Sequence, residues 1–457
     1  MTNPRRATLV FIGLDILSVT IVLNLIAWLR GILEFNGLIL LPLFVPIAAV
    51  MIAVYLIDGY RLRTDMLNLD YASQHAIALV AAMGGALLLT FVIMPFGYPL
   101  QQSRVVLAST FIVLIPLTLG YRRLLNGYYR HFRSARSIVF IGDQASAATF
   151  KQEWDRIGML QPLLFASGQT GATVPPMELP AGAPLPFSEI ISRMQRGELL
   201  VEAMVIRESN RAVNAQVSQQ LVDLYFSGTP TYTLELFHQV YWRKIPLYRL
   251  NQTWLFQEGF RVAREPVFER IKRASDVGLS LFGLFVFSPA LLLVATAIFL
   301  EDRGSVFFTQ TRIGKFRAPF KLYKFRTMRP SSSGDPYAQP GDLRVTRVGK
   351  LLRSSRLDEL PQLFNVLRGQ MSLIGPRAEW DRLVESYEKL IPSYHFRHLV
   401  RPGITGWAQV NYPYGANLED TQRKLEYDLY YIRHFSFRLD ASIVLKTIHV
   451  MLGAKGR

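Results

Sequence analysis

Two adjacent carboxylates, Asp358 and Glu359, stand among arginines in residues 353–367. Pro361 follows them, and because proline suits the first turn of a helix, a helix is predicted to begin close to the carboxylates. The start of a helix is electropositive, so it favours phosphate and keeps a nearby carboxylate ionised. An ionised aspartate beside a second acid that holds a divalent cation is the minimal equipment for attack on a phosphate. The same residues are equally compatible with a helix cap among solvated charges.

Basic side chains flank this pair in the sequence. Residues 310–329 contain seven lysines and arginines and no acid: Arg312, Lys315, Arg317, Lys321, Lys324, Arg326 and Arg329. On the other side, the turns at residues 371–377 and 401–407 each present an arginine, Arg377 and Arg401. Arginine forks suit phosphate. Each turn alone is ordinary loop chemistry, but several such segments around one carboxylate pair indicate a phosphate site.

The composition narrows the class of protein. With 457 residues the chain is long enough for two or three domains, and a hydrophobic content of 50% indicates membrane segments. The 51 basic residues outnumber 34 acidic ones, a net charge of +17 that suits nucleic acid, an anionic membrane or phosphorylated substrates. Membrane segments favour the last two, so no nucleic-acid partner is expected. The absence of cysteine excludes disulfides and thiol chemistry.

Residues 1–125 are predicted to form a four-span transmembrane bundle. The apolar runs are residues 7–29, 38–57, 76–94 and 105–120, lengths suited to a hydrocarbon layer about 30 Å thick. Arginines precede the first run and follow the second and fourth, whereas the turn at residues 95–102 has no charge. Because positively charged loops stay on the cytoplasmic side, both ends of this bundle are predicted to be cytoplasmic.

Residues 126–264 are predicted to form a degenerate Rossmann-like α/β domain. Strands are expected at residues 137–142, 199–206 and 229–234, with helices between them, a pattern typical of a parallel sheet. Only Gly142 remains of the glycine pattern that brings a dinucleotide close to the backbone. We therefore expect a structural or regulatory domain rather than a cofactor site. A proline-rich insertion is expected at residues 175–186.

Residues 265–457 are predicted to form a mostly helical catalytic domain that begins with a re-entrant membrane helix at about residues 276–301. The apolar run at residues 277–300 is interrupted by Ser288 and Pro289, which leaves two halves of about 16 Å each. Both flanks are basic and should remain in the same compartment. A helix that enters the membrane, breaks at the proline and returns satisfies both observations. A proline-kinked fifth span is the alternative.

Several of these stretches resemble the bacterial polyprenyl-phosphate sugar-1-phosphate transferases that initiate exopolysaccharide or O-antigen synthesis. The similar segments are residues 324–328, 356–363, 372–377 and 402–407, together with the Ser288-Pro289 break. The four-span bundle and the middle domain resemble the large single-chain members, the undecaprenyl-phosphate glucose or galactose phosphotransferases. Ala378 departs from the pattern, because the family usually has a second proline after Gly-Pro-Arg.

The resemblance implies a reaction, a cofactor and a location. Asp358 would be the nucleophile on the β-phosphate of a UDP-sugar, UMP would leave, and the phosphosugar would pass to undecaprenyl phosphate. Glu359 would help to hold Mg²⁺. Arg377, Arg401, Lys324 and Arg326 would bind phosphates. The protein would be a multi-pass protein of the bacterial inner membrane with a cytoplasmic catalytic domain, and the extra domains are compatible with a homodimer.

Two other classes of function remain open from the residues alone. One is a membrane scaffold of a polysaccharide assembly complex, whose basic domain only docks anionic lipid. The other is a membrane-tethered, NAD-dependent sugar-nucleotide oxidoreductase built on the middle domain. A scaffold has no need of the Asp358–Glu359 pair, and the missing glycines oppose the oxidoreductase. No residue in the sequence distinguishes which sugar is transferred.

Overall fold

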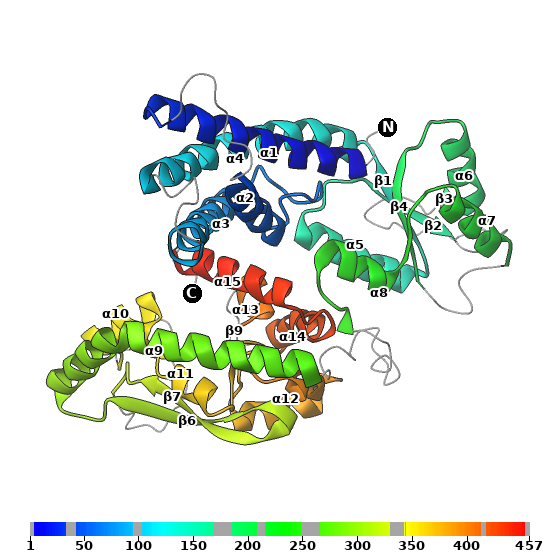
Figure 1. The fold of residues 1–457 in the computed structure, drawn as a ribbon. Coiled ribbons are helices and arrows are strands. Elements are labelled where there is room, and N and C mark those ends of the chain that lie inside the picture. The colour runs from blue at the N-terminus through cyan, green and yellow to red at the C-terminus, as the bar shows by residue number, and fades with distance from the viewer. Residues whose placement is uncertain are drawn as a thin grey trace. The chain divides into compact units, whose positions relative to one another are not determined.

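The computed structural model describes residues 4–32, 43–94, 103–167, 185–207, 215–247, 266–329, 342, 344–412 and 417–452. The chain divides into two compact units, residues 1–243 and residues 244–457 (Figure 1). The first contains apolar helices and a parallel sheet, and the second contains the carboxylate pair. The further division of the first unit at residue 125 stays a prediction.

The apolar helices of the first unit are α1 (Pro4–Leu29), α2 (Phe44–Leu56), α3 (Leu69–Leu88, continued by the π-helical turn Leu89–Ile93) and α4 (Arg104–Ser134). Helices α1, α3 with its π-helical turn, and α4 are long and apolar enough to cross a membrane, so apolar helices occur at three of the four predicted spans. Helix α2 has 13 residues and is shorter than the predicted second span, whose first residues, 38–42, lie outside the described residues. The chain is a membrane protein by the length and composition of these helices.

A buried ion pair joins the first and last helices of this bundle. Asp15 on α1, the one charge of the first predicted span, lies 2.5 Å from Arg122 on α4, and both side chains are buried. The Tyr60 hydroxyl donates to Asp15 over 2.5 Å, and the Tyr121 hydroxyl donates to the same carboxylate. Because a charge in an apolar bundle is stable only with its partner, these contacts specify how α1 and α4 align.

Replacing Asp15 with leucine should destabilise the bundle, because Arg122 then stays buried without a counter-charge. We expect the free energy of unfolding to fall by about 3 kcal/mol or more, measured by denaturant titration in detergent. The double variant Asp15→Leu/Arg122→Met should recover much of that loss. The exposed pair Asp65–Arg130, at 3.7 Å, provides the control, and Asp65→Leu should change stability little. Equal losses in the single and double variants would contradict the pairing.

The sheet of the first unit is parallel, as predicted. Its strands are β1 (Ser137–Ile141), β2 (Leu163–Ser167), β3 (Leu185–Pro186), β4 (Val201–Ile206) and β5 (Thr231–Thr233), in the order β3-β2-β1-β4-β5. Strands β2 and β3 were not predicted. On β1, Ile138 and Phe140 pack with α5 (Gln144–Ile157) and α8 (Leu234–Phe237), while Val139 and Ile141 pack with α6 (Phe187–Gln195) and α7 (Ala215–Phe226). Helices therefore cover both faces, which explains the continuous apolar run of β1.

An acidic side chain occupies the turn after β1. Asp143 caps α5 by accepting a hydrogen bond from the Ser146 backbone N–H at 3.0 Å, and it pairs with Arg207, which directly follows β4. In parallel sheets, ligands bind outside the carboxyl ends of two strands such as β1 and β4. A carboxylate at the start of α5 disfavours a pyrophosphate there. Most of the expected proline-rich insertion, residues 175–184, lies outside the described residues.

The second unit is mostly helical around a β-hairpin and a short parallel strand pair. Its elements in the described residues are α9 (Pro266–Asp302), β6 (Phe307–Ile313), the 3₁₀ turn η9 (Lys315–Arg317), β7 (Pro319–Phe325), α10 (Arg347–Ser355), the 3₁₀ turn η10 (Leu357–Glu359), α11 (Gln362–Leu367), β8 (Ser372–Ile374), α12 (Asp381–Leu390), the 3₁₀ turn η11 (Tyr394–Leu399), β9 (Gly403–Thr405), α13 (Trp407–Asn411), α14 (Leu418–Arg433) and α15 (Phe437–Leu452). The main core lies between the β8 region and α14, where Ile374, Trp407 and Leu429 are buried together.

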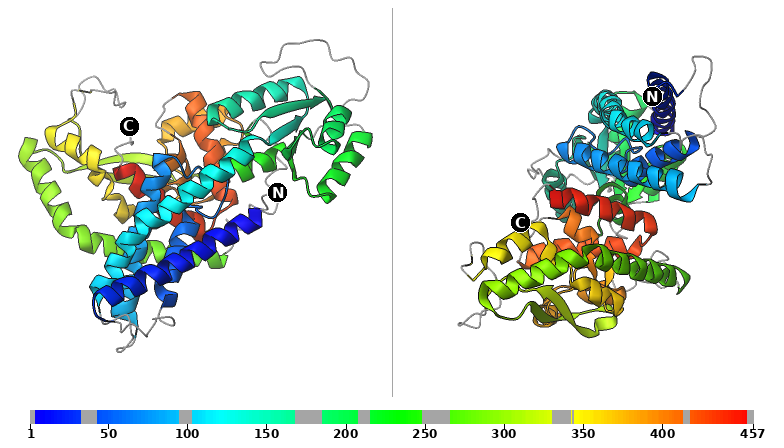
Figure 2. Two further views of the ribbon diagram at one scale, coloured as in Figure 1. Left: turned by 90° about the horizontal axis from the view of Figure 1, so that it is seen from above. Right: turned by 60° about the vertical axis from the view of Figure 1, so that its left-hand side comes forward.

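Helix α9 (Pro266–Asp302) differs from its prediction in one respect. The sequence predicted two halves separated by a break at Ser288 and Pro289, but the backbone stays helical through both residues. Pro289 lacks the N–H that would bond the Phe285 carbonyl, and the Ser288 hydroxyl donates to that carbonyl over 2.7 Å. The local hydrogen bond replaces the lost one, so the proline bends the helix without ending it. Figure 2 shows that α9 is bent.

Polar contacts hold both ends of α9 to other elements of the second unit. Near the start, Lys272 lies 2.5 Å from Asp440 on α15, and Arg273 donates to the carbonyls of Val366 and Leu367 at the end of α11. At the other end, Glu301 accepts a hydrogen bond from the Arg347 backbone N–H at 2.8 Å, and Asp302 pairs with Arg326. Between these ends the apolar side chains are largely exposed, for example Phe285 at 80% and Leu293 at 71%.

Candidate active site

The carboxylate pair lies in a tight turn between two helices. Arg356 ends α10 in the left-handed backbone conformation, with φ at 59°, and the 3₁₀ turn η10 follows at once. This conformation costs a non-glycine residue about 1 to 2 kcal/mol, so the surrounding packing must support it. The helix predicted near the carboxylates is α11, which begins at Gln362. Asp358 and Glu359 therefore lie in the turn just before that helix.

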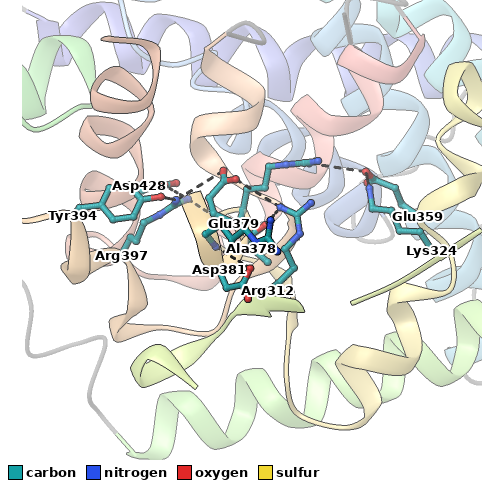
Figure 3. Close-up of polar contacts among 11 residues, drawn as sticks. Arg312, Lys324, Glu359, Ala378, Glu379, Asp381, Tyr394, Arg397 and Asp428 are labelled. Atoms are coloured by element: carbon teal, nitrogen blue, oxygen red, sulfur yellow. Dashed lines mark hydrogen bonds and ion pairs between the residues drawn. The ribbon is translucent and has the colours of Figure 1, made fainter. Parts of the chain in front are cut away.

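Cations from three elements surround Glu359. Lys324 Nζ on β7 lies 2.8 Å from Glu359 Oε1 and donates a hydrogen bond to it (Figure 3). The guanidinium groups of Arg356 and Arg377 lie 3.9 Å and 4.0 Å from the same oxygen. Burial by itself raises the pKa of Glu359, but Lys324 and Arg377 outweigh it and lower that pKa to about 2. Glu359 is therefore ionised at every physiological pH.

Asp358 is in a different environment, although it is the adjacent residue. Its side chain is buried, and within the described part of the chain its Oδ1 has no hydrogen-bond partner. Burial raises the pKa of Asp358 above its ordinary value, Lys324 opposes this rise, and the negative charge of Glu359 adds to it. Two neighbouring carboxyls whose pKa values move in opposite directions are suited to two different roles. An unpartnered buried oxygen is also available to a ligand or a metal ion.

A buried asparagine places Lys324 opposite Glu359. Asn365 on α11 is fully buried; its Nδ2 donates to the Lys321 carbonyl over 2.7 Å, and its Oδ1 accepts from the Tyr323 backbone N–H at 3.0 Å. The carboxamide thus pairs with β7 as another peptide group would. The helix of Asn365 follows the carboxylate turn directly, and Lys324 follows Tyr323 on the strand. The contact of Asn365 with β7 therefore aligns Lys324 with Glu359.

Arg377 is placed by close contact between two glycine-containing turns. The Gly375 backbone N–H donates to the Thr405 carbonyl, and the Gly403 N–H donates to the Pro376 carbonyl, both over 2.9 Å. A Cβ on Gly403 would lie 2.0 Å from the Gly375 nitrogen, so a side chain cannot fit there. The two turns that the sequence marked as arginine-bearing are therefore adjacent through β8 and β9.

Comparison with known proteins places this site in a family. Residues 267–454 match the family described as "Bacterial sugar transferase". The exopolysaccharide production protein PSS of Rhizobium leguminosarum bv. phaseoli is 42% identical over 39% of this chain and 93% of its own length. The chain belongs to the bacterial sugar transferase family.

Two larger relatives of this family carry activities in their names. The UDP-N-acetylgalactosamine-undecaprenyl-phosphate N-acetylgalactosaminephosphotransferase of Aeromonas hydrophila is 50% identical over 42% of this chain and 46% of that protein. The UDP-glucose:undecaprenyl-phosphate glucose-1-phosphate transferase of Escherichia coli (strain K12) is 44% identical over 39% of each chain. The similarity covers less than half of each of these two relatives.

The structure of this bacterial sugar transferase brings together some of the predicted site residues and not others. Lys324 and Arg377 lie against Glu359 beside Asp358. Arg326 pairs with Asp302 at the end of α9. Arg401 lies 2.6 Å from Glu269 on the first turns of α9 and donates to the Gly369 carbonyl over 3.0 Å.

Two arginines near the pair were not among the predicted site residues. Arg356 lies 3.9 Å from Glu359, and Arg353 acts on the pKa of Asp358 while donating to the Thr327 hydroxyl over 2.9 Å. Both belong to the same stretch as the carboxylates, so their position next to the pair was the available signal. The role of Asn365 carries no such signal, because a single asparagine in a short helix is usually a surface residue.

The donors present fit a magnesium ion completed by substrate. Within the described residues no group of three histidine, aspartate or glutamate side chains is assembled. The available donors are Asp358 Oδ1, which lacks a partner, and Glu359, whose contacts with the three cations are made through Oε1. Mg²⁺ is commonly held by one or two carboxylates together with phosphate oxygens of a substrate and water. The residue types agree with the predicted Mg²⁺ but leave its presence a proposal.

The ion pair between Lys324 and Glu359 should be detectable in the stability of the protein. Glu359→Gln should lower the free energy of unfolding at pH 7 by about 2 to 3 kcal/mol, because buried Lys324 loses its counter-charge. The pKa of Glu359 is about 2, below its ordinary 4.5, so its contribution is complete above pH 4.5 and is lost as the pH falls toward 2. The difference between variant and parent should therefore narrow below pH 4.5.

A second substitution checks the cause. Lys324→Met in the Glu359→Gln background removes the unpaired charge and should recover part of the stability, measured by the same denaturant titration. If the double variant is less stable than Glu359→Gln alone, the interaction between the two side chains has been misassigned.

Proposed function

We propose that this protein transfers a sugar 1-phosphate from a UDP-sugar to undecaprenyl phosphate and releases UMP, as the first membrane step of exopolysaccharide or O-antigen synthesis. The observation that carries the proposal is the buried Asp358–Glu359 pair among cations from several elements, in a domain that aligns with relatives named for this reaction. Cations at this place suit a diphosphate substrate, because charge stabilisation is the main requirement of phosphoryl transfer.

In the first step an Oδ oxygen of Asp358 attacks the β-phosphorus of the UDP-sugar. The bond from that phosphorus to the bridging oxygen breaks, and UMP leaves with the bridging oxygen and its electron pair. Asp358 suits this role because its pKa is raised by burial and its Oδ1 is not engaged by a donor in the described structure. Dividing one transfer into two lets two bulky substrates use one site in turn.

In the second step a phosphate oxygen of undecaprenyl phosphate attacks the same phosphorus. The bond to Asp358 breaks, the carboxylate is restored, and the phosphosugar is now joined to the lipid phosphate. Lys324 and Arg377 remain beside Glu359 and offset the negative charge that the two phosphates bring. Bound Mg²⁺, held by Glu359, would supply further charge stabilisation.

The lipid substrate requires the site to lie at a membrane, and α9 supports this. Polar contacts hold both ends of α9 to other elements of the second unit, while the middle of the helix exposes large apolar side chains. A helix that spans the membrane would place its two ends on opposite sides. We infer that α9 is re-entrant, bent at Pro289, with the catalytic domain on the cytoplasmic side of the bacterial inner membrane, where UDP-sugars are available.

The covalent route predicts a specific result for Asp358. The unaltered protein, given a UDP-sugar and Mg²⁺ without lipid acceptor, should release UMP in an amount no greater than the enzyme. Asp358→Asn keeps the size and removes the charge, and should release no measurable UMP, because an amide is not a useful nucleophile toward phosphorus. A panel of UDP-sugars with undecaprenyl phosphate identifies the sugar.

The control for this experiment is Asp342→Asn, since Asp342 pairs with Arg344 at 2.6 Å and belongs to no part of the proposed site. It should retain the UMP burst. If UMP appears only when both substrates are present, and no phosphosugar can be trapped on Asp358, a one-step transfer is the better account.

The re-entrant topology predicts where reporters become accessible. Reporter proteins fused after Arg264 and after Gly304 should both be cytoplasmic. Replacing Pro289 with leucine should restore a straight helix and move a fraction of the molecules to a spanning topology. A periplasmic signal after Gly304 in the unaltered sequence would rule out the re-entrant helix. Leu293→Ala, which shortens an exposed apolar side chain and leaves the bend intact, is the control.

A further inference from the structure

The backbone that carries Arg377 is held from outside at three consecutive carbonyls. The Arg377 carbonyl accepts a hydrogen bond from Arg397 Nη2 at 3.0 Å. The Ala378 carbonyl accepts from Arg312 Nη1 at 3.1 Å, and the Glu379 carbonyl accepts from the Ile313 backbone N–H at 3.1 Å. Residues 377–379 lie outside regular helix or strand, so these donors replace the hydrogen bonds of an element.

Arg397 is itself held firmly on the side away from Glu359. Its side chain is 6% exposed, and its Nη2 lies 2.9 Å from an oxygen of Asp428, which is 2% exposed. Its Nη1 donates to the Tyr394 hydroxyl over 2.5 Å, and its guanidinium lies over the Tyr394 ring (Figure 3). Glu379 lies 3.9 Å from the same guanidinium. A guanidinium can make several such contacts at once because its donors form a rigid fork, whereas a lysine cannot.

We propose that Arg397, oriented by Asp428 and Tyr394, is a positioning residue that sets where Arg377 stands relative to Glu359. The inference rests on the proposed function, because it gives Arg377 a phosphate to bind. Arg397 acts through the backbone: it holds the carbonyl of the same residue whose guanidinium lies 4.0 Å from Glu359. A shift of about 1 Å in a group that binds a reacting phosphate is enough to slow a reaction by about a hundredfold.

A second buried ion pair on the same helix provides a matched control. Glu426, two residues before Asp428 on α14, lies 3.0 Å from Lys244, and both side chains are buried. Glu426 also lies 3.7 Å from Arg423, on its own helix. The two acids thus share helix, burial and pairing with a cation, but only the Asp428 pair leads through Arg397 to Arg377. Glu426→Gln tests what the loss of a buried pair on α14 does by itself.

The experiment compares Arg397→Lys, Asp428→Asn and Tyr394→Phe with Glu426→Gln in the full-length protein. Hydrogen exchange of peptides that cover residues 375–380 is measured first, since it needs no turnover. We expect faster exchange there in the first three variants and no change in the control. The rate of UMP release should fall by about tenfold to a hundredfold in Arg397→Lys and Asp428→Asn. Glu426→Gln should retain the parent rate.

A double-mutant cycle separates positioning from general destabilisation. In an Arg377→Ala background the Arg397→Lys substitution should cost less than twofold, because the group that it positions is already absent. Full additivity of the two losses would overturn the proposal, and so would unchanged exchange at residues 375–380 in both Arg397→Lys and Asp428→Asn. If the unaltered protein releases no UMP from any UDP-sugar, the proposed function fails, and the hold of Arg397 on this segment is then decided by the exchange data alone.

Discussion

A buried carboxylate needs positive charge around it, and most of the second unit is arranged to bring that charge to Glu359. Lys324 comes from a β-hairpin, Arg356 from the end of a helix, and Arg377 from a turn. The hairpin, the helix end and the turn are separate segments of the chain. Each must therefore be held in place by its own contacts. Asn365 supports the hairpin, and the contact between two glycine turns supports Arg377.

Surrounding Glu359 with cations has a consequence for its neighbour. The cations lower the pKa of Glu359. At Asp358 the effect of burial is larger than that of the cations, and its pKa is raised. One turn therefore holds an acid that is always ionised and suited to a metal ion, beside an acid with an unengaged oxygen suited to attack. Adjacent residues gain different chemistry because their side chains point in different directions from a single tight turn.

Helix α9 combines polar ends with an exposed apolar middle. Charged residues at the two ends of the helix contact other elements of the second unit. Exposure of the apolar middle to water would be unfavourable. The Ser288 hydroxyl donates to the carbonyl that Pro289 leaves without a donor, which reduces the free-energy cost of a bend. In the first unit the arrangement is reversed: the polar contact between Asp15 and Arg122 is buried between two long apolar helices.

Features that depend on local pattern and composition could be predicted before the fold was known. Apolar helices at three of the four predicted spans follow from apolar runs. The parallel sheet follows from strand–helix alternation, and the helix start after the carboxylates follows from Pro361. The sequence also marked the carboxylate pair and the lysines and arginines that could serve it. Strands β2 and β3 were missed. Strand β3 is an edge strand of two residues, too short to carry a periodic pattern.

Which of the predicted lysines and arginines contact the carboxylate pair depends on tertiary packing. Lys324 and Arg326 are two residues apart on the chain, yet one faces Glu359 and the other pairs with Asp302. Arg401 lies in a turn that contacts the turn of Arg377, but its guanidinium engages Glu269 on α9. Where a long side chain finds its partner depends on the direction in which packing holds the backbone. That direction is set by contacts between segments far apart in sequence, which local pattern does not encode.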